Sequence, residues 1–106
     1  MKQAKRQRLE RKGWRVGSAK EFLRLSDEEA SYIELKVALG AELRGMRGKR
    51  SVTQMELAKL IDSSQSRVAK MESGDPSVSI DLIIKALLAL GASRKQIANA
   101  MVTKAA

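Results

Sequence analysis

Two short helix patterns joined by a tight turn constrain the fold of this chain more than any other segment. Thr53 can cap the first helix, and Glu56, three residues later, can complete a capping box. Ser64 can cap the second helix, and Gly74 stands where a helix ends in the left-handed conformation that glycine adopts without steric cost. We therefore expect helices over residues 54–61 and 65–72.

The apolar residues of these two helices predict how the pair packs. Ala58 is a small residue that faces the turn, where two helix backbones must approach each other closely. A pair of this kind is a helix-turn-helix, whose second helix lies in the major groove of bound DNA. The positions available to hold the pair against a core are Leu57, Leu60, Ile61, Val68 and Met71.

Cap residues and apolar spacing predict three further helices. A Ser-Asp-Glu-Glu run from Ser26 is a capping box at the start of a long helix, which we expect to end near Arg47. Ser79 can cap another helix, and Ser93 can cap a last one over about residues 94–102. No internal repeat and no strand-like alternation of useful length is present, so the sequence predicts an all-α domain with a five-helix core.

Basic residues are concentrated near the start of the chain. The 106 residues have a formal net charge of +9, and residues 1–20 hold eight basic side chains against one acidic side chain. We expect residues 1–25 to form a basic N-terminal arm and residues 26–106 to form the helix-turn-helix domain. Such an arm is common in nucleic-acid-binding proteins, but solubility and contact with anionic lipid are alternatives.

The composition excludes several kinds of site. The absence of cysteine excludes disulfides and zinc fingers, and the absence of histidine removes the commonest general base and metal ligand. No nucleophile motif and no phosphate-cradling glycine loop is present, so we expect no enzyme activity, cofactor or metal site. No apolar run approaches the ~20 residues of a membrane span, and the start is polar. We expect a soluble, cytoplasmic protein with no membrane partner.

The order of these features resembles the Cro/C1-type (XRE) helix-turn-helix family, which has a lambda-repressor-like fold. The resemblance covers about Leu39 to Gly91 and rests on TQMELA, SSQSRVAKMESG and LLALGAS. It implies a sequence-specific transcriptional regulator that binds double-stranded DNA, most simply an autoregulatory repressor. Asp62 departs from the pattern at the turn, where the family prefers glycine. Aspartate tolerates the left-handed conformation better than most residues do, so the departure is small.

The resemblance also implies which side chains contact DNA. Carried over by position, Gln54 at the start of the first helix would bind a backbone phosphate. On the second, recognition helix, the candidate positions lie opposite Val68 and Met71. Glutamine can pair bidentately with adenine and arginine with guanine, whereas Lys70 suits a phosphate as well as a base. The alternative is an ordinary solvated face. The predicted DNA-facing set is Ser64, Gln65, Ser66, Arg67 and Lys70.

A basic cluster precedes the helix pair and consists of Arg44, Arg47, Lys49 and Arg50. One interpretation is a favourable interaction with the negative end of the long helix. The other is contact with DNA phosphates beside the recognition helix, since phosphate contacts dominate protein–DNA affinity. Both can hold together, and we expect phosphate contact.

The segment GWRVG, followed by FLRLSDEEASYIELKVAL, resembles a second pattern. It is similar to the HigA-type branch of bacterial XRE proteins, which serve as antitoxins in RelE/HigB-type modules. This resemblance implies an alternative function, an antitoxin that binds and neutralises a toxin encoded beside it, with Trp14 and Phe22 as the partner contacts. Trp14 could equally fold back onto the long helix. The basic arm fits poorly against a basic toxin.

We expect a homodimer that binds a pseudo-palindrome, with half-sites ~34 Å apart, as two-fold symmetry requires. Because of its position at the end of the core, the last helix is expected to form the dimer contact, through Ile97, Met101 and Val102. A further alternative is a non-specific, chromatin-like protein that binds DNA through charge alone.

Overall fold

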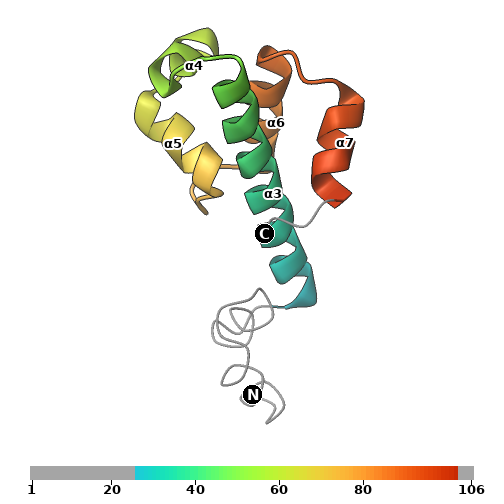
Figure 1. The fold of residues 1–106 in the computed structure, drawn as a ribbon. Helices are drawn as coiled ribbons and strands as arrows, with labels where there is room; N and C mark the ends of the chain where they lie inside the picture. Colours follow the sequence, from blue (N-terminus) through green and yellow to red (C-terminus); the bar gives the residue numbers. More distant parts are fainter. Residues whose placement is uncertain (1–25, 103–106) are drawn as a thin grey trace, which may run out of the picture. The chain divides into compact units, whose positions relative to one another are not determined.

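The computed structural model of the protein describes residues 26–102. This range contains five α-helices and no strand (Figure 1), which confirms the predicted all-α class. The observed ends of α4, α5 and α7 lie within one residue of the predicted ones. The helices are α3 (Asp27–Lys49), α4 (Gln54–Leu60), α5 (Gln65–Ser73), α6 (Ile80–Ala89) and α7 (Arg94–Val102).

Helix α3 begins as predicted and ends later than predicted. The Glu29 N–H donates to Ser26 Oγ at 3.1 Å, and the Ser26 N–H donates to Glu29 Oε1 at 2.9 Å, so the capping box is present. At the other end, the helix continues past Arg47 to Lys49. Gly45 and Gly48 near this end have nothing within 4 Å of an added Cβ atom, and the Arg50 N–H still donates to the Met46 carbonyl at 3.0 Å.

The chain divides into two compact units between Glu34 and Leu35, inside α3. The second unit contains the rest of α3 together with α4 to α7. The predicted division into an arm (1–25) and a domain (26–106) remains a prediction. Residues 1–25, which include the predicted partner contacts Trp14 and Phe22, lie outside the described range.

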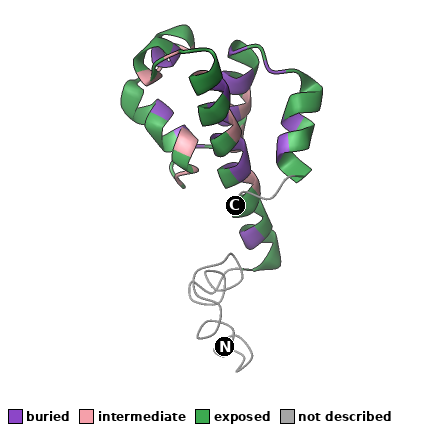
Figure 2. Ribbon diagram, in the orientation of Figure 1, coloured by how far each residue is buried: buried purple, intermediate pink, exposed green. Residues whose placement is uncertain are grey.

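The second unit has one hydrophobic core to which all five helices contribute. In Figure 1, the α4–α5 pair lies to the left of α3 and α7 lies to its right, and the buried residues of Figure 2 lie on the facing sides. Helix α7 contributes Ile97 and Ala100. Fully burying a large apolar side chain stabilises a fold by roughly 1.5–3 kcal/mol. The largest fully buried side chains are Leu39, Leu43, Leu57, Val68, Met71, Ile83 and Leu87.

One predicted core position is wrong. Leu60 is 58% exposed at the end of α4, whereas Leu57 and Ala58 are buried and Ile61 is half-buried against the core. The covered side of α4 bears residues 57 and 58, Ile61 caps the end of the helix, and Leu60 lies outside the covered stripe. Helical spacing alone does not show how wide a covered stripe is, because that width depends on the neighbouring helices.

The backbone of α3 lies directly against the end of α5. A Cβ atom on Gly40 would lie 2.4 Å from the Met71 carbonyl oxygen and 2.9 Å from that of Glu72. A Cβ on Gly74 would lie 3.1 Å from the Cα atom of Val37. Only glycine permits these approaches, so α5 rests on α3 through backbone contacts.

Candidate nucleic-acid interface

The caps predicted for the helix pair are present. The Glu56 N–H donates to Thr53 Oγ1 at 3.0 Å, and the Thr53 N–H donates to Glu56 Oε1 at 2.8 Å. Ser64 Oγ accepts from the Arg67 N–H at 3.1 Å at the start of α5. The two helix starts are therefore fixed by side chains that belong to the motif itself.

The turn between α4 and α5 is closed by a residue in the left-handed conformation. Asp62 has a φ of 56°, as expected for the position where the resembling family prefers glycine. The Ser63 N–H donates to the carbonyl of Ala58 at 2.7 Å, and Ala58 is buried. This turn brings the first residue of α5 beside the first residue of α4.

The predicted DNA-facing residues at the cap of α5 and on the helix itself are all exposed. Val68 and Met71 are fully buried, and they fix which side of the helix faces the core. All five residues are exposed, and their contact with DNA remains a prediction. The exposed residues are Ser64, Gln65, Ser66, Arg67 and Lys70.

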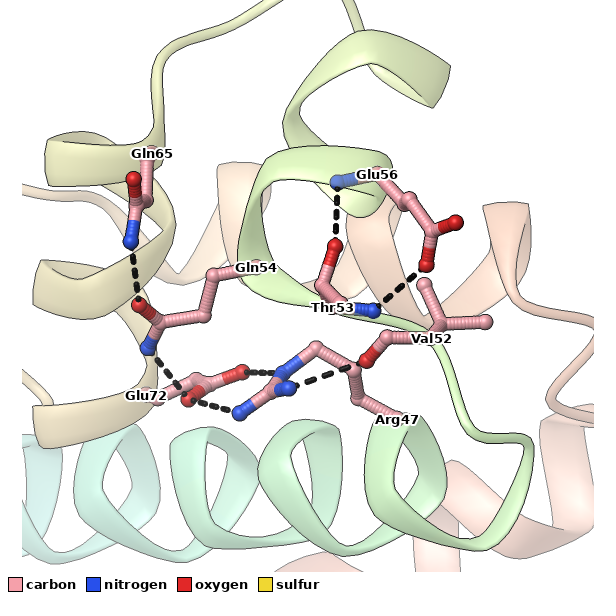
Figure 3. Close-up of polar contacts among 7 residues, drawn as sticks. All are labelled: Arg47, Val52, Thr53, Gln54, Glu56, Gln65 and Glu72. Atoms are coloured by element: carbon pink, nitrogen blue, oxygen red, sulfur yellow. Dashed lines mark hydrogen bonds and ion pairs between the residues drawn. The ribbon is translucent and has the colours of Figure 1, made fainter.

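A chain of polar contacts links Gln65 to the interior (Figure 3). Gln65 Nε2 donates to Gln54 Oε1 at 3.4 Å, and Gln54 Nε2 donates to Glu72 Oε1 at 3.0 Å. Gln54, predicted from its position to bind phosphate, is half-buried between these two partners. Its side chain therefore joins the start of α4 to both ends of α5.

Arg47 was predicted, as a member of the basic cluster, to contact phosphate, and its side chain is largely buried against Glu72. Its Nε and Nη2 donate to the two carboxylate oxygens of Glu72 at 2.5 and 3.1 Å, and its Nη1 donates to the Val52 carbonyl at 2.9 Å. The exposed fractions of the Arg47 and Glu72 side chains are 18% and 5%. The hydrogen bonds to Glu72 raise the pKa of Arg47, because they stabilise its charged form. Arg47 thus links α3 to α5 and to the segment before α4, and its contact with phosphate remains a prediction.

Sequence analysis missed Glu72. Its position gave a usable signal, because it lies two helical turns after Gln65 on α5 and directly follows the buried Met71. A carboxylate at the edge of a buried stripe needs a cationic or hydrogen-bonding partner. Which of the four basic residues before α4 would supply it depends on where α3 ends.

The other three basic residues of the cluster are exposed. Arg44, Lys49 and Arg50 lie at the end of α3 or just beyond it, and their contact with phosphate remains a prediction. The Arg50 guanidinium lies near the α6–α7 connection, since a Cβ atom on Gly91 would be 3.6 Å from it.

Comparison with known proteins decides the family. A protein-family model described as a helix-turn-helix domain matches residues 38–100, more than half of the chain. The chain belongs to this XRE-like helix-turn-helix family. No curated protein and no solved structure matches the chain. The match covers α4, α5 and all the side chains that are hydrogen-bonded in series from Arg47 to Gln65. It does not decide whether the protein belongs to the antitoxin branch.

A helix-turn-helix domain is a DNA-binding module, typically without enzyme activity. Its recognition helix here is followed by a turn in which Asp75 Oδ1 accepts from the Ser77 N–H at 2.8 Å. The hydrogen bonds from Ser77 lower the pKa of Asp75, because they stabilise the carboxylate. This turn lies between α5 and α6.

Residues 26–102 contain neither a metal-binding cluster nor a helix that could span a membrane. No group of three or more acidic side chains in this range is arranged to hold a metal ion. None of its helices is long and apolar enough to cross a membrane.

Proposed function

We propose that this helix-turn-helix protein is a sequence-specific transcriptional regulator that acts as an autoregulatory repressor. The observation that supports the proposal is the arrangement of α5. Its inner side is fully buried through Val68 and Met71, and its outer side exposes Gln65, Ser66 and Arg67 together. A helix held in this way by a second helix has the form that enters the major groove.

The exposed residues divide into two kinds of contact. Gln65 and Arg67 can make bidentate hydrogen bonds to adenine and guanine, which discriminate between bases. Arg44, Lys49 and Arg50 supply positive charge for phosphates, which adds affinity without sequence information. The proposed regulator therefore combines a small base-contacting face with a larger electrostatic one.

The proposed functional unit is a homodimer on a pseudo-palindrome with half-sites ~34 Å apart. Met101 and Val102 at the end of α7 are 38% and 80% exposed, so they are available for a contact between two copies. Ile97, which we expected to join them, is 8% exposed and packs in the core. We therefore narrow the proposed dimer contact to Met101 and Val102.

Selection of bound sequences from a random duplex library at ~150 mM salt tests the proposal, since phosphate-only binding weakens at that ionic strength. We expect a palindrome to be enriched. Gln65→Ala and Arg67→Ala should each lose preference at one base position, whereas Arg44→Ala should weaken binding to all sequences and lower the salt dependence. Absence of enrichment, with binding that vanishes as salt rises, would instead favour charge-only binding.

The antitoxin function is the second proposal and rests on the sequence alone. Co-expression with the neighbouring open reading frame, followed by a pull-down, tests it. Loss of capture by Trp14→Ala or Phe22→Ala, with DNA binding intact, would support a role in holding a toxin. Failure of the unaltered protein to capture that product would contradict the proposal.

A further inference from the structure

We propose that Glu72 is a positioning residue that makes Gln65 select adenine over guanine. It does so by fixing the amide orientation of Gln54, which in turn fixes that of Gln65. The inference rests on the proposed function, because it concerns how the recognition helix discriminates between bases. Glu72 itself faces the interior and does not contact DNA.

The first step is that Glu72 can only accept hydrogen bonds. Arg47 holds both of its carboxylate oxygens, through Nε at 2.5 Å and Nη2 at 3.1 Å. A carboxylate paired with a guanidinium is ionised and has no proton to donate. With 5% of its side chain exposed, Glu72 has little access to water that could replace these partners.

The second step is that this acceptor orients Gln54. An amide has a nitrogen that donates and an oxygen that accepts, and the two ends are similar in shape. The carboxylate of Glu72 binds only the nitrogen end, and Gln54 Nε2 lies 3.0 Å from Glu72 Oε1. The oxygen of Gln54 must then point the other way, towards Gln65.

The third step passes the orientation to the surface. Gln54 Oε1 can only accept, so Gln65 turns its nitrogen towards it, with 3.4 Å between Nε2 and Oε1. Gln65 then has one N–H and its oxygen available outside this contact, and it is exposed. This donor and acceptor match adenine, which offers an N7 acceptor and an N6 donor in the major groove.

The opposite orientation would favour another base. If Gln54 were reversed, its nitrogen would face Gln65, and Gln65 would turn its oxygen inward. Two N–H groups would then point outward, and they match guanine, whose N7 and O6 are both acceptors. The buried charge of Glu72 excludes this arrangement, so a residue that does not face the groove determines which purine is preferred.

The test compares affinities for operator duplexes that carry adenine or guanine at the position identified by Gln65→Ala. Glu72→Gln retains the side-chain length but offers either end of an amide to Gln54. Gln54→Met leaves the Arg47–Glu72 pair intact and removes the link to Gln65. We expect each variant to lower the adenine-to-guanine affinity ratio about five-fold or more, the range of one good bidentate contact. In the Gln65→Ala background neither variant should change the ratio further.

A destabilised control separates positioning from a merely structural role. Ile97→Val removes one methylene group from the core on α7, away from the hydrogen bonds that join Arg47, Glu72, Gln54 and Gln65. The adenine-to-guanine affinity ratio of this variant should equal that of the unaltered protein. A uniform loss of affinity with an unchanged ratio in Glu72→Gln and Gln54→Met would overturn the inference. If Glu72→Gln does not fold, Gln54→Met decides alone.

Failure of the inference differs from failure of the proposed function. An unaltered protein with no base preference would contradict the regulator and the inference together. If Gln65→Ala loses base preference at no position of the operator, the inference is overturned and the proposed regulator is left in place.

Discussion

Gly40 is the residue of α3 at which one added methyl group has the largest expected effect. Its Cβ would lie 2.4 Å from the Met71 carbonyl oxygen, a backbone atom that cannot rotate away. We expect Gly40→Ala to lower the free energy of unfolding by about 1–3 kcal/mol, as overpacking does. Denaturant unfolding followed by circular dichroism measures the change.

Gly45→Ala is the matched control on the same helix. A Cβ at Gly45 has no heavy atom within 4 Å, so the substitution adds helix propensity without a clash. We expect a gain of roughly 0.5–1 kcal/mol. Equal effects of the two substitutions would contradict the close approach of α3 and α5.

The turn after the recognition helix should respond to acid through Asp75. The hydrogen bonds from Ser77 lower the pKa of Asp75 below its ordinary value of 3.8 in the folded state. The stability that this carboxylate contributes is therefore present above pH 3.8 and is lost as the pH falls through the lower folded pKa. An NMR titration of the Asp75 carboxyl should give a midpoint below that of the urea-unfolded chain.

Asp75→Asn provides the control, because its amide oxygen can still accept from the Ser77 N–H and does not titrate. Its stability should depend less on pH between 5 and 2, the range in which an ordinary and a lowered carboxyl pKa both lie. A folded-state midpoint at or above 3.8 would refute the assignment.

Single residues were predictable where the constraint is local. At Asp62 the resemblance to the family marked a left-handed turn position, and a turn of this kind depends on only a few neighbouring residues. The pair of Arg47 with Glu72 was not predictable from spacing, because it joins residues 25 positions apart through the packing of α3 on α5. Ser51 also has a φ of 56°, which its sequence surroundings did not indicate.

At the scale of elements, α4 depends most on its cap. It spans seven residues, too few for a helix to persist by its own hydrogen bonds. Thr53→Ala removes the acceptor for the Glu56 N–H and should lower the free energy of unfolding by about 0.5–2 kcal/mol. Thr53→Ser keeps the oxygen and should restore most of the loss. Equal losses for the two variants in thermal unfolding would exclude a capping role.

Helix starts were easier to predict than the end of α3. Ser26, Thr53, Ser64 and Ser79 each cap the helix expected from the sequence, since a cap and its backbone partner lie three residues apart. The end of α3 depends on whether anything crowds its glycines, and nothing lies within 4 Å of a Cβ at Gly48. Such information comes from neighbouring helices and not from the segment itself.

At the scale of the whole molecule, the proposed dimer gives a direct prediction. Val102→Asp places a charge on the exposed end of α7 and should raise the dimer dissociation constant about tenfold or more, equivalent to 1.4 kcal/mol. Sedimentation of the free protein and of its complex with a palindrome measures the change. Binding to a single half-site should remain unchanged. A monomer in both conditions before substitution would contradict the dimer.

The fold and the outer face of the site were predictable, and the connections beneath that face were not. Caps, turn residues and two buried positions on α5 suffice to orient the recognition helix. The series of hydrogen bonds from Arg47 through Glu72 and Gln54 to Gln65 joins four side chains from three helices. It therefore forms only when the core is assembled.

The bare-backbone contact at Gly40 has a consequence for how such a protein could acquire new operators. Helix α5 contacts Gly40 of α3 through its own backbone carbonyl oxygens. Its exposed side chains can therefore be replaced without changing this contact. In the proposed regulator, residues 66, 67 and 70 could therefore be replaced independently of one another to change the bases that are preferred. Residue 65 is not independent, because the Gln65 amide is hydrogen-bonded to Gln54. A different residue at position 65 would therefore require a matching residue at position 54.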